Sequence, residues 1–176
     1  MRFKDEITNK IMFAFILLFI FHESNKAQYL TNEKIAFYSS SLFYCVLEAV
    51  TEAYAIKEKE EANPFLKTKY MQTWHKTKLF REIATVGTGV TIALDSKVEP
   101  VKLFSNFFVT AAMFWIIHDE LINRINGWNQ IPFGYTSKSS GVWTGFNGSF
   151  FDKYANPYIK ISALVISVLL NMVLTQ

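Results

Sequence analysis

The sequence has little cysteine, histidine and charge, and each shortage excludes a class of protein. Cys45 is the only cysteine among 176 residues, so the chain cannot form an internal disulfide. The three histidines do not combine with it in the spacing of a zinc module. Charged residues make up 19% of the chain, with a net charge of +3 and no arginine-rich run, which argues against a nucleic-acid partner.

Familiar catalytic motifs are absent as well. The chain contains no Gly-x-Ser-x-Gly nucleophile elbow, no phosphate loop and no dinucleotide-binding Gly-x-Gly-x-x-Gly. The two closely spaced glycines at 87 and 89 lie inside an apolar helix candidate, so we interpret them as helix-packing residues. The sequence therefore does not identify a reaction.

Apolar residues are abundant instead. Hydrophobic residues make up 51% of the chain and aromatic residues 16%, a composition that excludes a disordered protein. The four prolines lie between long apolar segments or at their starts, and none lies inside one, so these segments can be helical. We predict an all-α fold with a single helical domain at 28–176.

The N-terminal segment has the order of a secretory signal peptide. Arg2, Lys4 and Lys10 precede the apolar run 11–21, which is shorter than the roughly 20 residues that span a bilayer. A small residue, Ala27, ends the polar stretch that follows. We predict a signal peptide at 1–27, with an uncleaved first membrane helix as the alternative.

Four further segments are long enough to form helices: 35–56, 79–94, 101–117 and 158–174. The last two carry only a lysine near one end, where its long side chain can reach the interface, and both are typical of membrane-spanning helices. The first contains two glutamates and the second has a short uncharged stretch, so both are weaker candidates. We predict a polytopic helical membrane protein with about four transmembrane helices after the signal sequence.

The distribution of basic residues favours four crossings. If the chain starts inside, fourteen of the 18 basic residues fall on the inner side and four on the outer side, as the positive-inside rule requires. If 79–94 does not cross, the distribution becomes ten to eight and shows no bias. We expect a membrane location, in the inner (cytoplasmic) membrane of a bacterium.

Two connecting segments are predicted to be loops. The segment 57–78 starts with alternating lysine and glutamate and continues with aromatic residues among lysines, which suits a basic stretch at the membrane surface. The segment 119–154 holds five of the seven glycines with many aromatic residues. This composition is typical of an interfacial aromatic belt, and a soluble substrate-binding loop is the alternative.

Ionisable residues near the predicted membrane segments fall on one side of the four-crossing arrangement. Glu48 and Glu52 follow Ser41 and Cys45 at the 4, 3, 4 spacing of one helical face. Polar groups at membrane depth are costly, so they usually pair with one another or mark a site. The candidate catalytic residues on this side are Glu48, Glu52, His75, His118 and Asp119.

These residues allow two kinds of binding site. A divalent metal could be held by imidazole and carboxylate groups, since both suit zinc or iron, although no closely spaced metal motif is present. The candidate metal ligands are His75, His118, Glu52 and Asp119. Alternatively, Arg81 and Arg124, with His75 nearby, would hold the phosphate of an anionic lipid.

A third interpretation is purely structural. Glu48 and Glu52 would pair with Arg81 or a lysine across the bundle and fix the packing of its helices. This interpretation predicts a small integral membrane protein with a structural or binding role, whose polar cluster near the cytoplasmic face binds an anionic lipid or a partner. The expected partners are membrane lipids and a second copy or another membrane protein.

Two other functions stay open at this stage. One is a membrane-embedded hydrolase or transferase, with or without a metal, acting on a lipid-like substrate through the carboxylates and histidines named above. The other is a soluble or peripheral helical bundle, which the glutamates in 35–56 and the short apolar stretch of 79–94 would suit.

Overall fold

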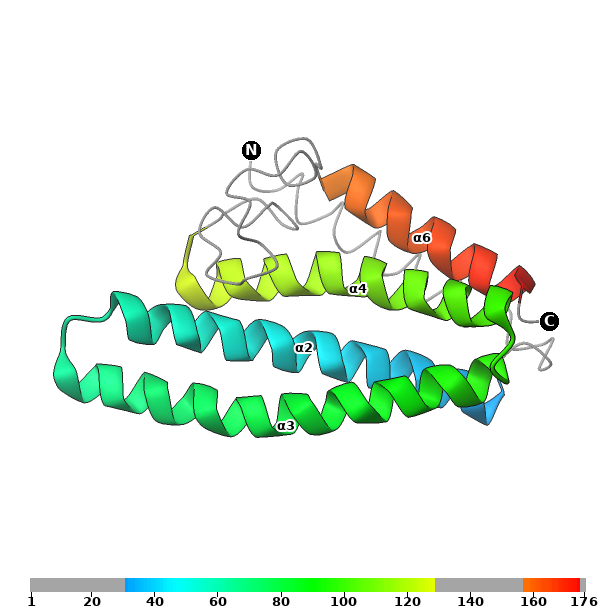
Figure 1. Ribbon diagram of the computed structural model, residues 1–176. Helices are drawn as coiled ribbons and strands as arrows, with labels where there is room; N and C mark the ends of the chain where they lie inside the picture. The colour runs from blue at the N-terminus through cyan, green and yellow to red at the C-terminus, as the bar shows by residue number, and fades with distance from the viewer. Residues whose placement is uncertain (1–30, 129–156, 175–176) are drawn as a thin grey trace. The chain divides into compact units, whose positions relative to one another are not determined.

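Short polar connections divide the chain into long helices. A computed structural model describes residues 31–128 and 157–174. These residues form α2 (Asn32–Glu60), α3 (Pro64–Ser96), α4 (Pro100–Asn126) and α6 (Pro157–Leu174) (Figure 1). No strand occurs in these two stretches, which confirms the predicted all-α fold for them. The predicted signal peptide at 1–27 and most of the aromatic and glycine-rich loop lie outside the described residues.

The helix ends follow from local chemistry. Asn63 precedes α3, and its side-chain oxygen accepts hydrogen bonds from the backbone N–H groups of Phe65 and Leu66, at 2.9 and 3.4 Å. Proline stands first in α3, α4 and α6, where its fixed φ suits a helix and its missing N–H costs nothing. Gly127 ends α4 with a φ of 69°, a left-handed conformation that glycine adopts without strain.

Both predicted loops next to these helices are too long. Only residues 61–63 separate α2 from α3, so the predicted loop 57–78 is mostly helical. The segment 79–94 is accordingly the second half of a longer helix. The second loop is predicted to start at residue 119, but α4 continues to Asn126, so the first eight residues of the predicted loop 119–154 belong to a helix that ends at 126. Charged and aromatic residues suggest the end of an apolar helix, but none of them breaks a helix, so both helices continue through them.

Three helices pack side by side and the fourth joins them through α4. α2 lies against α3 and α4, and α6 packs on α4 (Figure 1). Short connections join α2 to α3 and α3 to α4, so these neighbours run in opposite directions. Asn171, near the end of α6, contacts Lys34 near the start of α2 and Asn106 near the start of α4. The start of α2 therefore lies near the end of α3, the start of α4 and the end of α6. We call this the Asp95 end, and the opposite end, where α2 stops and α3 begins, the Asn63 end.

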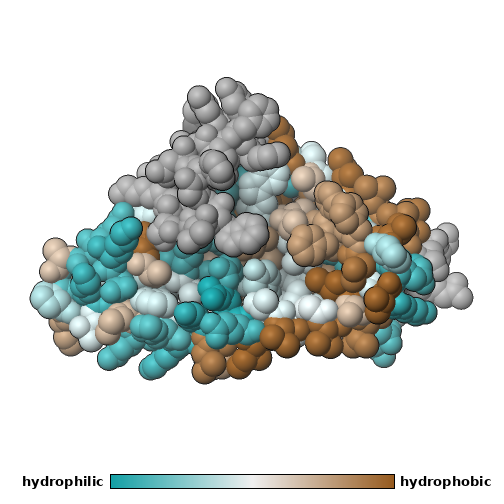
Figure 2. Space-filling model, in the orientation of Figure 1, coloured by the Kyte–Doolittle hydropathy of each residue, from teal (hydrophilic) through white to brown (hydrophobic). Residues whose placement is uncertain are grey.

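The two ends of the bundle have opposite polarity. At the Asn63 end, α2 and α4 enclose an apolar core of Ala49, Ala53, Ile56 and Ile122. At the Asp95 end, most buried side chains apart from Phe37 are polar, while large apolar side chains point outward. In Figure 2, the apolar residues, coloured brown, gather on the half of the visible surface where α3 ends and α6 lies. Those on α3 are 53–69% exposed: Leu79, Phe80, Ile83, Val86, Val90 and Leu94.

Two of the four helices are long and apolar enough to cross a membrane. They are α4 and α6, by length and composition. α2 and α3 are longer, but they carry more charged side chains and are not apolar enough to count as membrane-spanning helices. The predicted transmembrane character therefore holds for two helices by composition, and not for all four.

Candidate functional site: two buried polar clusters

A buried ion pair lies at the Asp95 end. The Lys34 ammonium on α2 is 2.7 Å from the carboxylate of Asp95 on α3, and their side chains are 6% and 3% exposed. Isolated charges are very costly to bury, so each depends on the other. This pair joins the start of α2 to the end of α3, 61 residues apart in sequence.

Side-chain amides extend this ion pair to α4 and α6. Asn106 donates a hydrogen bond to Asp95 at 2.9 Å, and Asn171 accepts one from Lys34 at 3.1 Å. Asn171 donates to Asn106 at 2.6 Å and also accepts from Tyr38 at 2.9 Å. Both asparagines are fully buried. We call the set Lys34, Tyr38, Asp95, Ser105, Asn106 and Asn171 the Asp95 cluster; it links all four described helices.

A second cluster lies nearer the middle of the bundle. Nε2 of His118 on α4 is 2.7 Å from the Glu52 carboxylate on α2, and its Nδ1 is 3.8 Å from Asp119. Asp119 in turn pairs with Lys160 on α6, a lysine with no exposed surface. We call Glu52, His118, Asp119 and Lys160 the His118 cluster. In it, acidic and basic groups alternate across three helices.

Aromatic rings surround the His118 cluster. The ring of Phe114 stacks on His118 with centroids 4.4 Å apart. The Lys160 ammonium lies 5.6 Å from the centre of the Trp115 ring, a cation–π distance. Rings on these two sides reduce solvation of the charges, which strengthens the attraction between them. The cluster is thus held by both charge pairing and packing.

Hydroxyl groups line the interior between the two clusters. Ser41 on α2 and Thr110 on α4 share a hydrogen bond of 2.9 Å, and Ser40 and Thr91 share one of 2.6 Å. Thr88 donates to the backbone carbonyl of Ser40 at 3.0 Å, which brings α3 close to α2. Polar contacts between helices therefore continue along much of the bundle interior.

The structure supports one predicted pairing and changes another. Arg81 contacts Glu48 across α2 and α3 at 3.3 Å, as the structural interpretation expected. Glu52 pairs with His118 instead of Arg81 or a lysine. Because α4 continues past residue 117, His118 and Asp119 lie on a helix and not in a loop. Their place on α4 is what brings them to α2 and α6.

Other predicted site residues lie apart from these clusters. His75 is exposed on α3 and stacks on Trp74, with centroids 3.9 Å apart. Arg124 is paired with Glu120 on its own helix. Arg81 and Arg124 thus both have carboxylate partners, and the structure does not bring them together as a phosphate site. Within 31–128 and 157–174, no three His, Cys, Asp or Glu side chains are grouped as a metal site.

In both clusters, buried basic groups are paired with carboxylates. Lys34 balances Asp95, and Lys160 together with His118 faces two carboxylates. A histidine between carboxylates can hold a proton that both acids attract. Each charged group also joins two helices, so its removal would leave its partner buried and unpaired. The arrangement specifies which helices meet and in what register.

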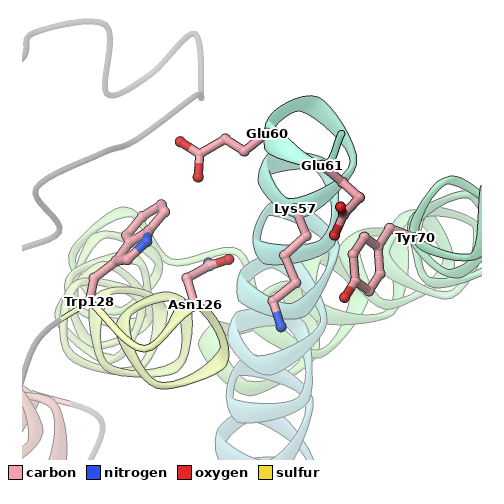
Figure 3. A pocket seen from close by; sticks show the side chains of 6 residues that line it. All are labelled: Lys57, Glu60, Glu61, Tyr70, Asn126 and Trp128. Carbon is pink, nitrogen blue, oxygen red and sulfur yellow. The ribbon is translucent and has the colours of Figure 1, made fainter. Parts of the chain in front are cut away.

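An open hollow of about 200 Å³ lies at the Asn63 end (Figure 3). Lys57 projects into it, with its ammonium 5.6 Å from the centre of the Tyr70 ring. Asn126, the last residue of α4, and Trp128, just after that helix, stand across from it. Glu60 and Glu61 form its rim. Its lining mixes both charges with aromatic rings and matches no single ligand class.

Sequence reasoning missed the Asp95 cluster and Lys160. A lysine near the end of an apolar segment is expected to reach the membrane surface, whereas Lys34 and Lys160 are buried in the bundle. A usable signal was present on α6: Lys160, Ser167 and Asn171 recur at spacings of 7 and 4, which places them on one helical face. These are also the buried residues of α6.

Comparison with known proteins adds no relative. No protein-family model, no curated protein and no solved structure matches this chain.

Proposed function

We propose that the chain is a small integral membrane protein with a structural or binding role, whose Asp95 end lies in the lipid bilayer. In this arrangement α4 and α6 cross the membrane, and α2 and α3 accompany them. Their apolar outer faces contact lipid, and their ionisable groups pair inside the bundle. The distribution of polar and apolar side chains in α6 and in the whole bundle supports the proposal.

The observation that carries the proposal is the arrangement of α6. Its buried residues, Lys160, Ser167 and Asn171, are all polar. Its exposed residues are large and apolar: Tyr158, Ile159, Val165, Ile166, Leu169, Leu170, Val173 and Leu174. A helix in water buries its apolar stripe, and a contiguous apolar surface of this kind marks a contact with membrane or protein. The polarity of α6 is that of a helix in lipid.

The dimensions of the bundle agree with a bilayer. The 18 residues of α6 are about 27 Å long, close to the roughly 30 Å of a hydrocarbon core. α2 and α3 have 29 and 33 residues and are about 44 and 50 Å long. They therefore extend beyond α6, and their excess length forms the Asn63 end, where the interior is apolar and the surface is charged.

Basic residues assign an orientation to the proposed membrane protein. Residues 57–81 carry seven lysines and arginines near the Asn63 end, whereas 95–102 carry two at the Asp95 end. By the positive-inside rule, the Asn63 end faces the cytoplasm, which extends the proposal to the cytoplasmic membrane of a bacterium. The His118 cluster would then lie near the cytoplasmic side of the bilayer.

Alkaline carbonate extraction tests the membrane proposal directly. Membranes from expressing cells are washed with carbonate and then with detergent, and the full-length protein is followed by immunoblot. We expect the protein to stay in the membrane pellet after carbonate and to leave it in detergent. Release by carbonate would overturn the proposal in favour of a soluble or peripheral bundle.

Cysteine labelling in intact cells tests the orientation. In a Cys45→Ser background, single cysteines replace Lys67 near the Asn63 end or Lys97 at the Asp95 end; both are exposed. An impermeant thiol reagent should label the variant at 97 in intact cells and the variant at 67 only after lysis. Labelling of both positions in intact cells would contradict α2 and α3 crossing with the bundle.

A further inference from the structure

The first half of α3 carries an unusual concentration of positive charge. Residues 64–81 contain five lysines and arginines and no aspartate or glutamate. By contrast, the end of α2, at 57–61, contains two lysines and three glutamates. The excess of positive charge at the Asn63 end therefore belongs to α3. Its lysines lie on two sides of the helix: Lys69 and Lys76 share one side, and Lys67 and Lys78 share the opposite one. We call Lys69 and Lys76 the lysine face of α3.

These four lysines differ from Lys57, Lys59 and Lys97 in their surroundings: their own segment has no acidic residue, whereas each of the other three has a glutamate or aspartate within two residues in sequence. No lysine of either group is within ion-pair distance of a carboxylate in the described parts of the chain. Lys34, Lys102 and Lys160 pair with Asp95, Glu99 and Asp119, and Arg81 and Arg124 pair with glutamates. Lys78 lies over the ring of Trp74, and Lys67, Lys69 and Lys76 are exposed.

The lysine face continues directly into the apolar outer surface. Lys69, Lys76, Ile83 and Val90 are seven residues apart and therefore share one stripe of the helix. Along this stripe the exposed side chains change from basic to apolar at Leu79 and Phe80, which are 58% and 56% exposed. At 1.5 Å per residue, Lys76 lies about 5 Å beyond this change of polarity. The headgroup layer of a bilayer occupies this depth.

We propose that the lysine face of α3 binds the headgroups of anionic phospholipids in the leaflet on the side of the Asn63 end. Lys76 would contact a lipid phosphate, while the acyl chains of the same lipid lie along Leu79, Phe80 and Ile83. Lys69, one heptad farther out, adds long-range attraction to the anionic surface. This inference rests on the proposed membrane location and replaces Arg81 and Arg124 as the lipid-binding residues.

Spin-labelled lipids test the proposal in vesicles of defined composition. The full-length protein is reconstituted in phosphatidylcholine vesicles with a trace of spin-labelled phosphatidylglycerol or phosphatidylcholine. Electron paramagnetic resonance then gives the fraction of each lipid that is immobilised at the protein surface. We expect the wild type to prefer phosphatidylglycerol, and the preference to weaken in high salt because the contacts are electrostatic.

A matched pair of variants locates the surface. Lys69→Gln/Lys76→Gln removes two charges from the lysine face, and Lys59→Gln/Lys97→Asn removes two exposed charges elsewhere. We expect the first variant to lose about fivefold of the preference, the factor of one ordinary lysine contact with an anionic membrane surface. The second should keep the preference of the wild type. Equal preference in all three proteins would overturn the proposal, and so would a wild type without preference.

The same samples separate this proposal from the one on which it rests. All four substituted lysines are exposed, so the helical content by circular dichroism should not change. A protein that enters vesicles and immobilises phosphatidylcholine, but shows no preference for phosphatidylglycerol, is a membrane protein without this lipid surface. A protein that immobilises neither lipid would contradict the membrane location itself.

Discussion

Lys34 and Asp95 join the start of α2 to the end of α3 through an ion pair of 2.7 Å that is almost completely buried. Their partners Asn106 and Asn171 come from the other two helices. All four helices thus converge on one pair of opposite charges. Because removal of one member leaves the other charged and buried, the pair should control whether the Asp95 end assembles.

A double-mutant cycle on this pair gives the first prediction. Lys34→Met and Asp95→Asn each leave an uncompensated polar or charged group in the interior, and each should lower the free energy of unfolding by about 3 kcal/mol. The double variant should lose clearly less than the sum of the two. Reversible unfolding by sodium dodecyl sulfate in mixed micelles measures all three values. Losses below about 0.5 kcal/mol in the single variants would mean that the pair does not hold the bundle.

The outward polarity of α6 gives a second prediction. Ile166 is 56% exposed on this helix, and Ile166→Lys should reduce membrane insertion, since a lysine at the centre of a spanning helix costs about 3 kcal/mol. Leu174→Lys, at the end of the same helix, is the control, because its side chain can reach the interface. The carbonate-resistant fraction of each protein is measured after expression. A helix in water would accept both substitutions equally well.

Close packing of α2 and α3 gives a third prediction. Ala84 is 7% exposed at this contact, whereas Val86 on the same helix is 69% exposed. Ala84→Phe should cost about 1–3 kcal/mol through overpacking. Val86→Phe should leave the free energy of unfolding within about 0.5 kcal/mol of the wild type. Thermal unfolding in detergent, followed by circular dichroism, compares the two, and equal stability would argue against this contact.

The buried thiol gives a fourth prediction. Cys45 has no exposed surface, and its thiol is directed to the backbone carbonyl of Thr110 at 3.9 Å. It should therefore react with a maleimide in mild detergent only as fast as the bundle opens. A Cys45→Ser/Lys97→Cys variant, whose new thiol is exposed, should react within the mixing time under the same conditions. Rapid reaction of wild-type Cys45 would show that α2 and α4 do not stay packed.

The sequence allowed the helical class and the pairing of Glu48 with Arg81 to be predicted, because both depend on local periodicity and charge. The helix bounds were harder. Residues 64–78 contain no glycine, and their proline stands first in α3, so nothing stops the helix although lysines and aromatic rings suggest a surface segment. Residues 118–126 likewise contain no glycine or proline, so α4 continues through them. The sequence-based prediction of a loop there puts His118 outside the helix, whereas the structure puts it beside Glu52.

The buried lysines were the least predictable part of the candidate site. Lys34 and Lys160 lie near helix ends, where a lysine ordinarily reaches water. Whether such a side chain turns inward depends on an acid from another helix, and that acid is far away in sequence. The polar face of α6, with Asn171 and Ser167, gave evidence that could have been used.

The connection of only three residues between α2 and α3 has a consequence for biosynthesis. For the proposed membrane protein, Lys34 on α2 would be made before Asp95, and an unpaired lysine inside the bilayer would cost free energy. The charge is neutralised once α3 has been made and has folded back along α2. Release into the bilayer as a completed helical hairpin, instead of one helix at a time, is the order of events that this ion pair favours.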